Sequence, residues 1–170
     1  MLINSINNDS TICALATAMG GAIGIIRVSG NRTIEIVNSI FTKNLNEAKP
    51  NTVHYGHINN EQGKIIDEVL ISIFHAPHSY TGENSAEISC HGSQYILSTV
   101  LELLIKNGAT LAKPGEFTQR AYLNGKIDLS QAEAVADLIS STTEATHNIA
   151  ISQLKGHFSS ELHILRDQLL

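Results

Sequence analysis

The sequence predicts an α+β domain with a mixed or mostly antiparallel sheet, followed by a helical segment. Short apolar runs typical of strands alternate with amphipathic stretches up to about residue 125, without the regular rhythm of a doubly wound fold. From Leu129 onward no strand signal remains. We therefore expect an N-terminal α+β domain at residues 1–125 and the beginning of a helical domain at residues 126–170.

Composition and charge limit the classes of function. A chain of 170 residues, 42% hydrophobic and 16% charged, can bury an ordinary core. Its formal net charge of −5 lacks the basic footprint of nucleic-acid-binding proteins, so these residues alone should bind nucleic acid poorly. No apolar run reaches the roughly 18 residues of a membrane span, and the polar N-terminus does not resemble a signal peptide. The two cysteines form no CxxC motif, and a cytoplasmic location is expected.

Alternating apolar residues and turn signals predict the strands. The expected strands are Thr11–Thr17, Ile25–Ser29, Val53–Ile58, Glu68–His75 and Ser85–Cys90. A glycine-rich turn at residues 20–24 separates the first two. In the strand at 68–75, large apolar residues occupy both sets of alternating positions, which predicts that both of its faces are covered.

Two helices are expected among these strands. Residues 31–41 carry apolar side chains at the spacing of one helical face. Ser93 is a suitable N-cap for a second helix with a broad apolar stripe, and Gly108 is placed to end it.

The stretch at residues 113–139, KPGEFTQRAYLNGKIDLSQAEAVADLI, carries the densest local signals. A Pro-Gly pair breaks the chain before a short helix that begins at Glu116, and Asn124-Gly125 ends that helix because both residues tolerate positive φ. The turn that follows holds Lys126 between two ordered elements, a geometry that can aim a cation.

Capping signals predict the remaining helices. Asp128 and Gln131 form one capping box, and Ser141 with Glu144 forms a second. Beyond the second box, apolar residues recur every three or four positions and predict an amphipathic helix with a narrow seam that reaches the last residue. The residues of this seam are Ile151, Leu154, Phe158, Leu162, Leu165 and Leu169. A helix that is still apolar at its end suggests a fragment, or a partner surface outside the chain.

The stretch at 113–139 resembles the N-terminal region of the tRNA modification GTPases of the MnmE/TrmE type, which carries a PGEF…RA…NGK-DL-QAEA-ADLI segment. The resemblance extends over essentially all 170 residues. The family's chains run further, through more of the helical domain, an inserted GTPase domain and a C-terminal cysteine motif. The resemblance implies a domain similar to the tetrahydrofolate-binding domain of the glycine cleavage T protein, and a homodimer whose two copies build the folate sites.

The resemblance also implies the work of the full protein. It would be a GTP hydrolase that uses potassium and magnesium in the absent domain and acts with a flavoprotein of the MnmG/GidA type. Together they would install a carboxymethylaminomethyl-type group at C5 of the wobble uridine of certain tRNAs, with 5-formyltetrahydrofolate or a related tetrahydrofolate as cofactor. No P-loop occurs here, because Gly125-Lys126 is followed by Ile127 rather than Ser or Thr. The residues present are therefore not expected to hydrolyse GTP or to be catalytic.

Three residues are candidates for holding the folate. Glu87 lies among small and apolar neighbours in a strand, where a carboxylate needs a partner, and it could accept N–H bonds from a flat pterin. Arg27 lies in an apolar strand, and its fork of donors suits a carboxylate or a ring edge. A charge that simply faces water is the alternative for these two and for Lys126. By resemblance all three match folate-contacting positions, and we expect Glu87 to meet the pterin and at least one cation to meet the carboxylate tail.

Other motifs are weak or depart from the family. The turn at residues 18–22, AMGGA, lacks the arginine of the family's commoner Pro-Pro-Gly-Arg-Gly-Gly loop and is not a convincing dinucleotide motif. The histidine pairs His54/His57 and His75/His78 lack metal-site spacing, so no metal is expected. Two other functions stay open: a purely structural dimerisation module without a ligand, and a small-molecule enzyme that binds phosphate at the glycine-rich turn.

Overall fold

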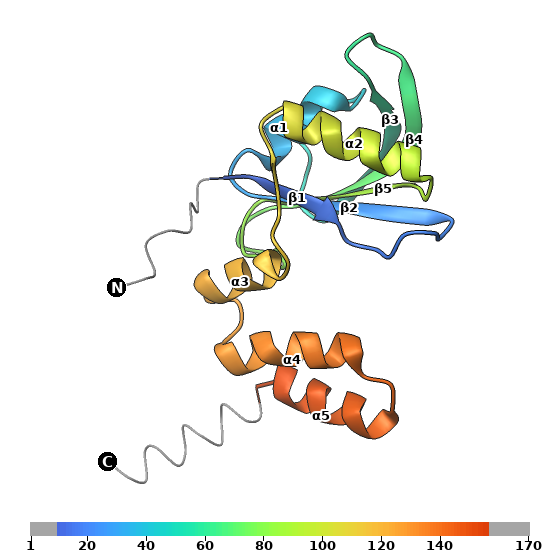
Figure 1. The fold of residues 1–170 in the computed structure, drawn as a ribbon. Helices are drawn as coiled ribbons and strands as arrows, with labels where there is room; N and C mark the ends of the chain where they lie inside the picture. Colours follow the sequence, from blue (N-terminus) through green and yellow to red (C-terminus); the bar gives the residue numbers. More distant parts are fainter. Residues whose placement is uncertain (1–9, 157–170) are drawn as a thin grey trace. The chain divides into compact units, whose positions relative to one another are not determined.

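The structure, a computed structural model, describes residues 10–156. The chain divides into two compact units, Met1–Pro114 and Gly115–Leu170. Among the described residues the first unit holds all the strands and two helices, and the second holds three helices (Figure 1). Strands and helices are thus segregated as in an α+β protein, which confirms the predicted fold class.

The first unit is built on a six-stranded mixed sheet with the order β3-β4-β5-β2-β1-β6. Neighbouring strands are antiparallel except β1 and β6, which are parallel. The strands are β1 (Ile12–Leu15), β2 (Ile23–Ser29), β3 (Thr52–Asn59), β4 (Ile65–Phe74), β5 (Ser85–His91) and β6 (Thr110–Leu111). The first five confirm the predicted strands within a few residues. The sixth was not predicted, because two residues are too short to show a period.

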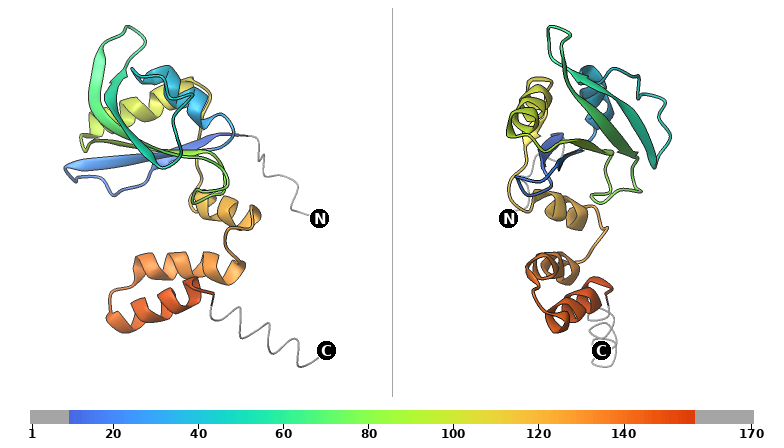
Figure 2. Two further views of the ribbon diagram at one scale, coloured as in Figure 1. Left: turned by 180° about the vertical axis from the view of Figure 1, so that it is seen from behind. Right: turned by 90° about the vertical axis from the view of Figure 1, so that its right-hand side faces the viewer.

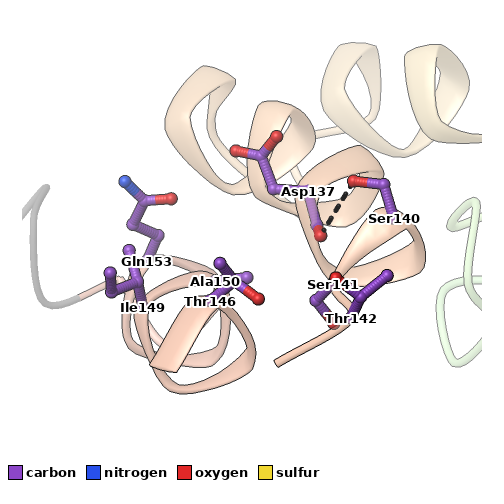
Figure 3. A pocket seen from close by; sticks show the side chains of 8 residues that line it. All are labelled: Asp137, Ser140, Ser141, Thr142, Thr146, Ile149, Ala150 and Gln153. Atoms are coloured by element: carbon purple, nitrogen blue, oxygen red, sulfur yellow. Dashed lines mark hydrogen bonds between the residues drawn. The ribbon is translucent and has the colours of Figure 1, made fainter. Parts of the chain in front are cut away.

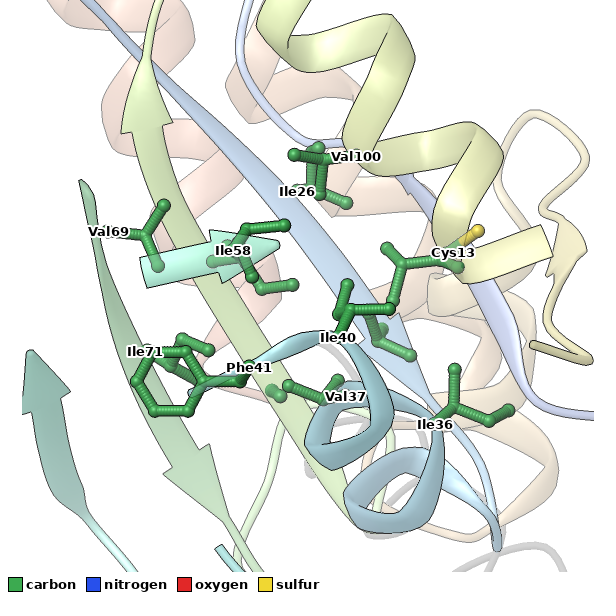
Figure 4. Close-up of a cluster of buried hydrophobic side chains, with 14 of the residues drawn as sticks. Cys13, Ile26, Ile36, Val37, Ile40, Phe41, Ile58, Val69, Ile71 and Val100 are labelled. Atoms are coloured by element: carbon green, nitrogen blue, oxygen red, sulfur yellow. The ribbon is translucent and has the colours of Figure 1, made fainter. Parts of the chain in front are cut away.

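Two helices, α1 (Thr33–Ile40) and α2 (Gln94–Lys106), pack with the sheet around one apolar core. Figure 2 shows these helices and the sheet from two further sides. The buried side chains come from alternate strand positions and from the apolar stripes of the helices (Figure 4). Ile26 from β2, Ile71 from β4 and Val100 from α2 are all fully buried there. Ser93 occupies the predicted N-cap of α2, although its side chain makes no capping hydrogen bond. Gly108, with φ of 104°, follows the end of the helix as predicted.

The opposite side of the sheet, which we call the outer face, carries large exposed apolar side chains. They are Ile23, Val53, Tyr55 and Leu70. Alternation along β4 buries Val69 and Ile71 but leaves Leu70 46% exposed. The prediction that both faces of this strand are covered is therefore wrong, because the two helices of the unit pack with the core on one side only.

The second unit contains α3 (Glu116–Leu123), α4 (Leu129–Ser140) and α5 (Glu144–Leu154). The capping box of α4 is confirmed: the Gln131 backbone N–H donates to Asp128 Oδ1 at 2.8 Å, and the Asp128 N–H donates to Gln131 Oε1 at 2.9 Å. The end of α3 is also confirmed, with Asn124 as its C-cap and Gly125 at a φ of 68°.

Two predictions for the last helices are wrong. Thr143, with Thr146, forms the second capping box, because Ser141 instead ends α4 and its N–H donates to the Leu138 carbonyl. The long seam helix is interrupted, since α5 ends at Leu154 and Gly156 adopts a φ of 77°. The rest of that predicted helix, 157–170, lies outside the described residues.

Replacing the cap residue of α4 by Asp128→Ala should destabilise the first turn of the helix by about 1 kcal/mol, the usual worth of an N-cap side chain. The substitution removes the acceptor for the Gln131 N–H. Amide hydrogen exchange over the first turn of α4 measures the effect. Ser130→Ala, in the same turn, is the matched control and should leave the exchange unchanged; equal protection in both variants would contradict the capping role.

Candidate functional site

The structure brings two of the three predicted site residues together. Arg27 on β2 and Glu87 on β5 are direct cross-strand partners in the antiparallel register. Arg27 Nε and Nη2 both donate to Glu87 Oε1, at 3.0 and 2.8 Å. Each side chain is 28% exposed, so the ion pair lies on the outer face and is partly shielded from water. Neither residue is simply a strand charge that faces the solvent.

The pair leaves one carboxylate oxygen available. Among residues 10–156, Glu87 Oε1 takes both arginine donors and Oε2 accepts no hydrogen bond. Ser72 on β4 is the other cross-strand neighbour of Glu87. A carboxylate that binds a guanidinium through one oxygen can accept N–H donors of a ligand at its other oxygen.

A tyrosine that the sequence did not single out completes this cluster. Tyr80, in the loop between β4 and β5, places its ring over the Arg27 guanidinium, with 5.2 Å from Cζ to the ring centroid. A cation above an aromatic face is attracted by the ring's negative charge distribution. A lone aromatic residue in a turn-rich loop has no periodicity, and only the tertiary fold brings it to a strand 53 positions earlier in the chain, Arg27 to Tyr80.

Lys126 belongs to the second unit, in the turn after α3. Its backbone N–H donates to the Ala121 carbonyl at 2.9 Å. This hydrogen bond fixes the turn that the Asn-Gly pair predicted. The side chain is exposed. Its meeting with Arg27 and Glu87 stays a prediction.

A second polar group joins β4 to the end of β5. Asp67 is buried, and its two carboxylate oxygens meet His91, the backbone N–H at 2.8 Å and Nδ1 at 2.7 Å. Beside it the Tyr55 hydroxyl donates to Glu68 Oε2 at 2.9 Å, and this bond holds the pKa of the Glu68 carboxyl below its ordinary value. Tyr55, Glu68 and His91 border a shallow hollow of about 250 Å³, lined mainly by apolar atoms.

A further cavity of about 260 Å³ lies between α4 and α5 (Figure 3). Its lining is rich in hydroxyl groups: Ser140, Ser141, Thr142 and Thr146, beside Asp137 and Gln153. Ser140 Oγ donates to the Asp137 backbone carbonyl at 3.2 Å, so that hydroxyl supports the helix end. Of the described residues, no lysine or arginine lines the cavity, and none of the three predicted site residues does.

Between residues 10 and 156, no group of three or more His, Cys, Asp or Glu side chains is arranged to hold a metal ion. No helix in that range is long and apolar enough to cross a membrane.

Both thiols should be inert in the folded protein. Cys13 and Cys90 are buried, and burial raises their pKa from the ordinary value of 9.0 to about 11 and about 12. Because the pKa of each thiol is higher in the folded state than in the unfolded state, the protonated thiols contribute stability that is complete below about pH 9. This contribution is lost as the pH rises through 11 to 12.

A thiol-specific disulfide reagent at pH 8 should react with these buried thiols only after unfolding in urea. Rapid reaction of either thiol without denaturant would contradict the burial.

Comparison with known proteins gives a consistent result for both units. A family model described as "GTP-binding protein TrmE N-terminus" matches residues 11–126, and one described as "MnmE helical domain" matches residues 129–170. Proteins named "tRNA modification GTPase MnmE" are similar to this chain. That of Bacteroides fragilis is 62% identical over 168 residues, 96% of this chain and 36% of the relative. That of Flavobacterium johnsoniae is 55% identical over 170 residues, 97% of this chain and 36% of the relative. The chain thus spans about a third of the length of these relatives.

Proposed function

Because the chain belongs to the MnmE/TrmE family of tRNA modification GTPases, we propose that it is the folate-binding N-terminal part of such a protein. Its ligand is 5-formyltetrahydrofolate or a related one-carbon tetrahydrofolate. The observation that carries this proposal is the Arg27–Glu87 ion pair on the outer face of the sheet. Sequence predicted each residue separately as a ligand contact, and the fold makes them neighbours.

The chemistry of the pair fits a reduced pterin. The ring offers adjacent N–H donors, and Glu87 presents a charged carboxylate whose Oε2 accepts no hydrogen bond from residues 10–156. Hydrogen bonds to an ionised acceptor are about twice as strong as neutral ones. Since Arg27 is bound to Glu87, we assign the remaining predicted cation, Lys126, to the carboxylate tail of the folate.

The outer face also supports a homodimer. Exposed apolar side chains at Ile23, Val53, Tyr55 and Leu70 gather on the same face as the ion pair, with exposures of 46% to 63%. Contiguous exposed apolar surface is typical of an interaction site. Two copies that pair through this face would cover the apolar residues and enclose the folate.

The wider role follows from the family. We assign GTP hydrolysis, with potassium and magnesium, to the region of these proteins that the chain does not span, because no P-loop occurs here. The full protein would act with an MnmG/GidA-type flavoprotein on the wobble uridine of tRNA, in the cytoplasm. The net charge of −5 indicates that the main tRNA contacts lie outside this chain.

Calorimetric titration of the protein with 5-formyltetrahydrofolate tests the proposal. We expect saturable heat with the folate and none with GTP or NAD. Light scattering with and without the folate reports whether the copies pair. Pairing without any folate heat would favour a purely structural dimerisation module, and heat with GTP or NAD alone would favour a phosphate-binding enzyme; either result would overturn folate binding.

A further inference from the structure

The loop between β4 and β5, residues 75–84, is fixed to the sheet by buried hydrogen bonds. Ser29 on β2 and Thr81 in the loop are both fully buried, and their hydroxyls lie 2.7 Å apart. Ser29 Oγ also donates to Glu83 Oε2 at 2.7 Å. The loop therefore has a defined position relative to β2, and so does Tyr80, the residue before Thr81.

The far end of the same loop is held as firmly. The Asn84 carbonyl accepts hydrogen bonds from the Gly30 N–H and the Thr33 hydroxyl, each at 3.0 Å. The Asn84 side chain accepts one from the Ala76 N–H at 3.0 Å, which closes the loop on itself. Buried and satisfied polar networks make a segment rigid, so Tyr80 is presented by a fixed support.

The ring of Tyr80 lies beside the Arg27–Glu87 ion pair. A free guanidinium beside a carboxylate prefers two parallel bonds, one to each oxygen. Here both donors, Nε and Nη2, converge on Glu87 Oε1, while the guanidinium carbon lies 5.2 Å from the Tyr80 ring centroid. This arrangement leaves Glu87 Oε2 for a ligand, whereas the two-oxygen fork would occupy it.

We propose that Tyr80 is a positioning residue that holds the Arg27 guanidinium on one oxygen of Glu87 and so keeps the other oxygen available to the ligand. This inference rests on the proposed folate binding at the same site. It assigns Tyr80 a role that acts through Arg27 and depends on the aromatic face, with no need for the hydroxyl.

Three variants at this position distinguish the effect of the aromatic ring from the effects of the hydroxyl and of side-chain size. Tyr80→Phe keeps the ring and should bind 5-formyltetrahydrofolate as the unchanged protein does. Tyr80→Leu and Tyr80→Ala lose the cation–π contact and should bind about three- to tenfold more weakly, the effect expected of such a contact at a partly exposed site. Tyr80 is 40% exposed, so these variants should fold. Equal affinity in all three would overturn the proposal.

A double-mutant cycle tests whether the effect passes through Arg27. Lysine keeps the positive charge but cannot form the planar two-oxygen pairing with a carboxylate. In an Arg27→Lys background Tyr80 therefore has no such pairing to prevent. Tyr80→Leu should then change the affinity by less than about twofold. A loss of affinity as large as that of the single variant Tyr80→Leu would show that Tyr80 contacts the ligand directly, and would overturn the positioning role.

Crystal structures of the ligand-free variants give a readout that does not depend on folate. In Tyr80→Phe both arginine donors should stay on one oxygen of Glu87. In Tyr80→Leu the guanidinium should bond both oxygens or turn away from Glu87. Identical arrangements would overturn the inference even if folate binds, whereas absent folate heat with the unchanged protein would overturn the proposed function and leave this structural result to decide the role of Tyr80 toward Arg27.

Discussion

Replacing Glu87 by alanine should weaken the binding of 5-formyltetrahydrofolate by roughly 100-fold or more. The substitution removes the acceptor proposed for the pterin N–H groups and leaves the Arg27 guanidinium without its carboxylate partner. In the proposed complex the folate covers the ion pair, and truncating one partner of a buried hydrogen-bonded charge pair costs about 2–5 kcal/mol at binding sites. Calorimetric titration of the variant beside the unchanged protein measures the loss.

The matched control is Glu68→Ala. Glu68 is a carboxylate on the same face, on the neighbouring strand β4, and it is 58% exposed. Its partners are Tyr55 and His57, not Arg27. Its loss should leave folate affinity within about twofold, since an exposed pair contributes little. If Glu87→Ala bound as tightly as Glu68→Ala, Glu87 would be excluded from the site.

Replacing Gly92 by alanine should destabilise the first unit by about 3 kcal/mol or more, the upper range for forcing atoms into a packed site. A Cβ built on Gly92 would lie 1.8 Å from the Gly21 carbonyl oxygen, far inside any permitted contact. The Gly92 N–H also donates to the Ala22 carbonyl at 2.9 Å, so the two backbones cannot separate without losing that bond. Urea unfolding measures the change in the free energy of unfolding.

Gly21→Ala is the control for this close approach. Gly21 lies on the other side of the same contact, but a Cβ built there meets only the Ile23 carbonyl oxygen at 3.4 Å. We expect a cost below about 1 kcal/mol, as for ordinary substitutions in exposed segments. Equal stability of Gly92→Ala and Gly21→Ala would mean that the glycine-rich turn is not held against the start of the segment after β5.

The parts of the fold that depend on local signals could be predicted from the sequence. Asp128 with Gln131 forms the expected capping box because both partners lie within one turn. Ser141 fails as an N-cap because two capping signals overlap, and the end of α4 uses Ser141 first. No local rule ranks such competing signals, since the preceding helix decides between them.

The candidate site shows the same limit. Sequence placed Arg27 and Glu87 on separate strands, but their hydrogen bonds depend on the register of β2 against β5, 60 residues apart in the chain. Tyr80 could not be found without that register and the fixed loop. The exposure of Leu70 was also missed, because a strand with apolar residues at every position does not reveal which face the helices cover.

The most direct measurement is a crystal structure of the protein with 5-formyltetrahydrofolate. Our account predicts the pterin on the outer face of the sheet, with its N–H donors within hydrogen-bond distance of Glu87 Oε2 and with Arg27 still bonded to Oε1. A folate seated elsewhere, such as the cavity between α4 and α5, with Glu87 contacting only Arg27, would contradict it.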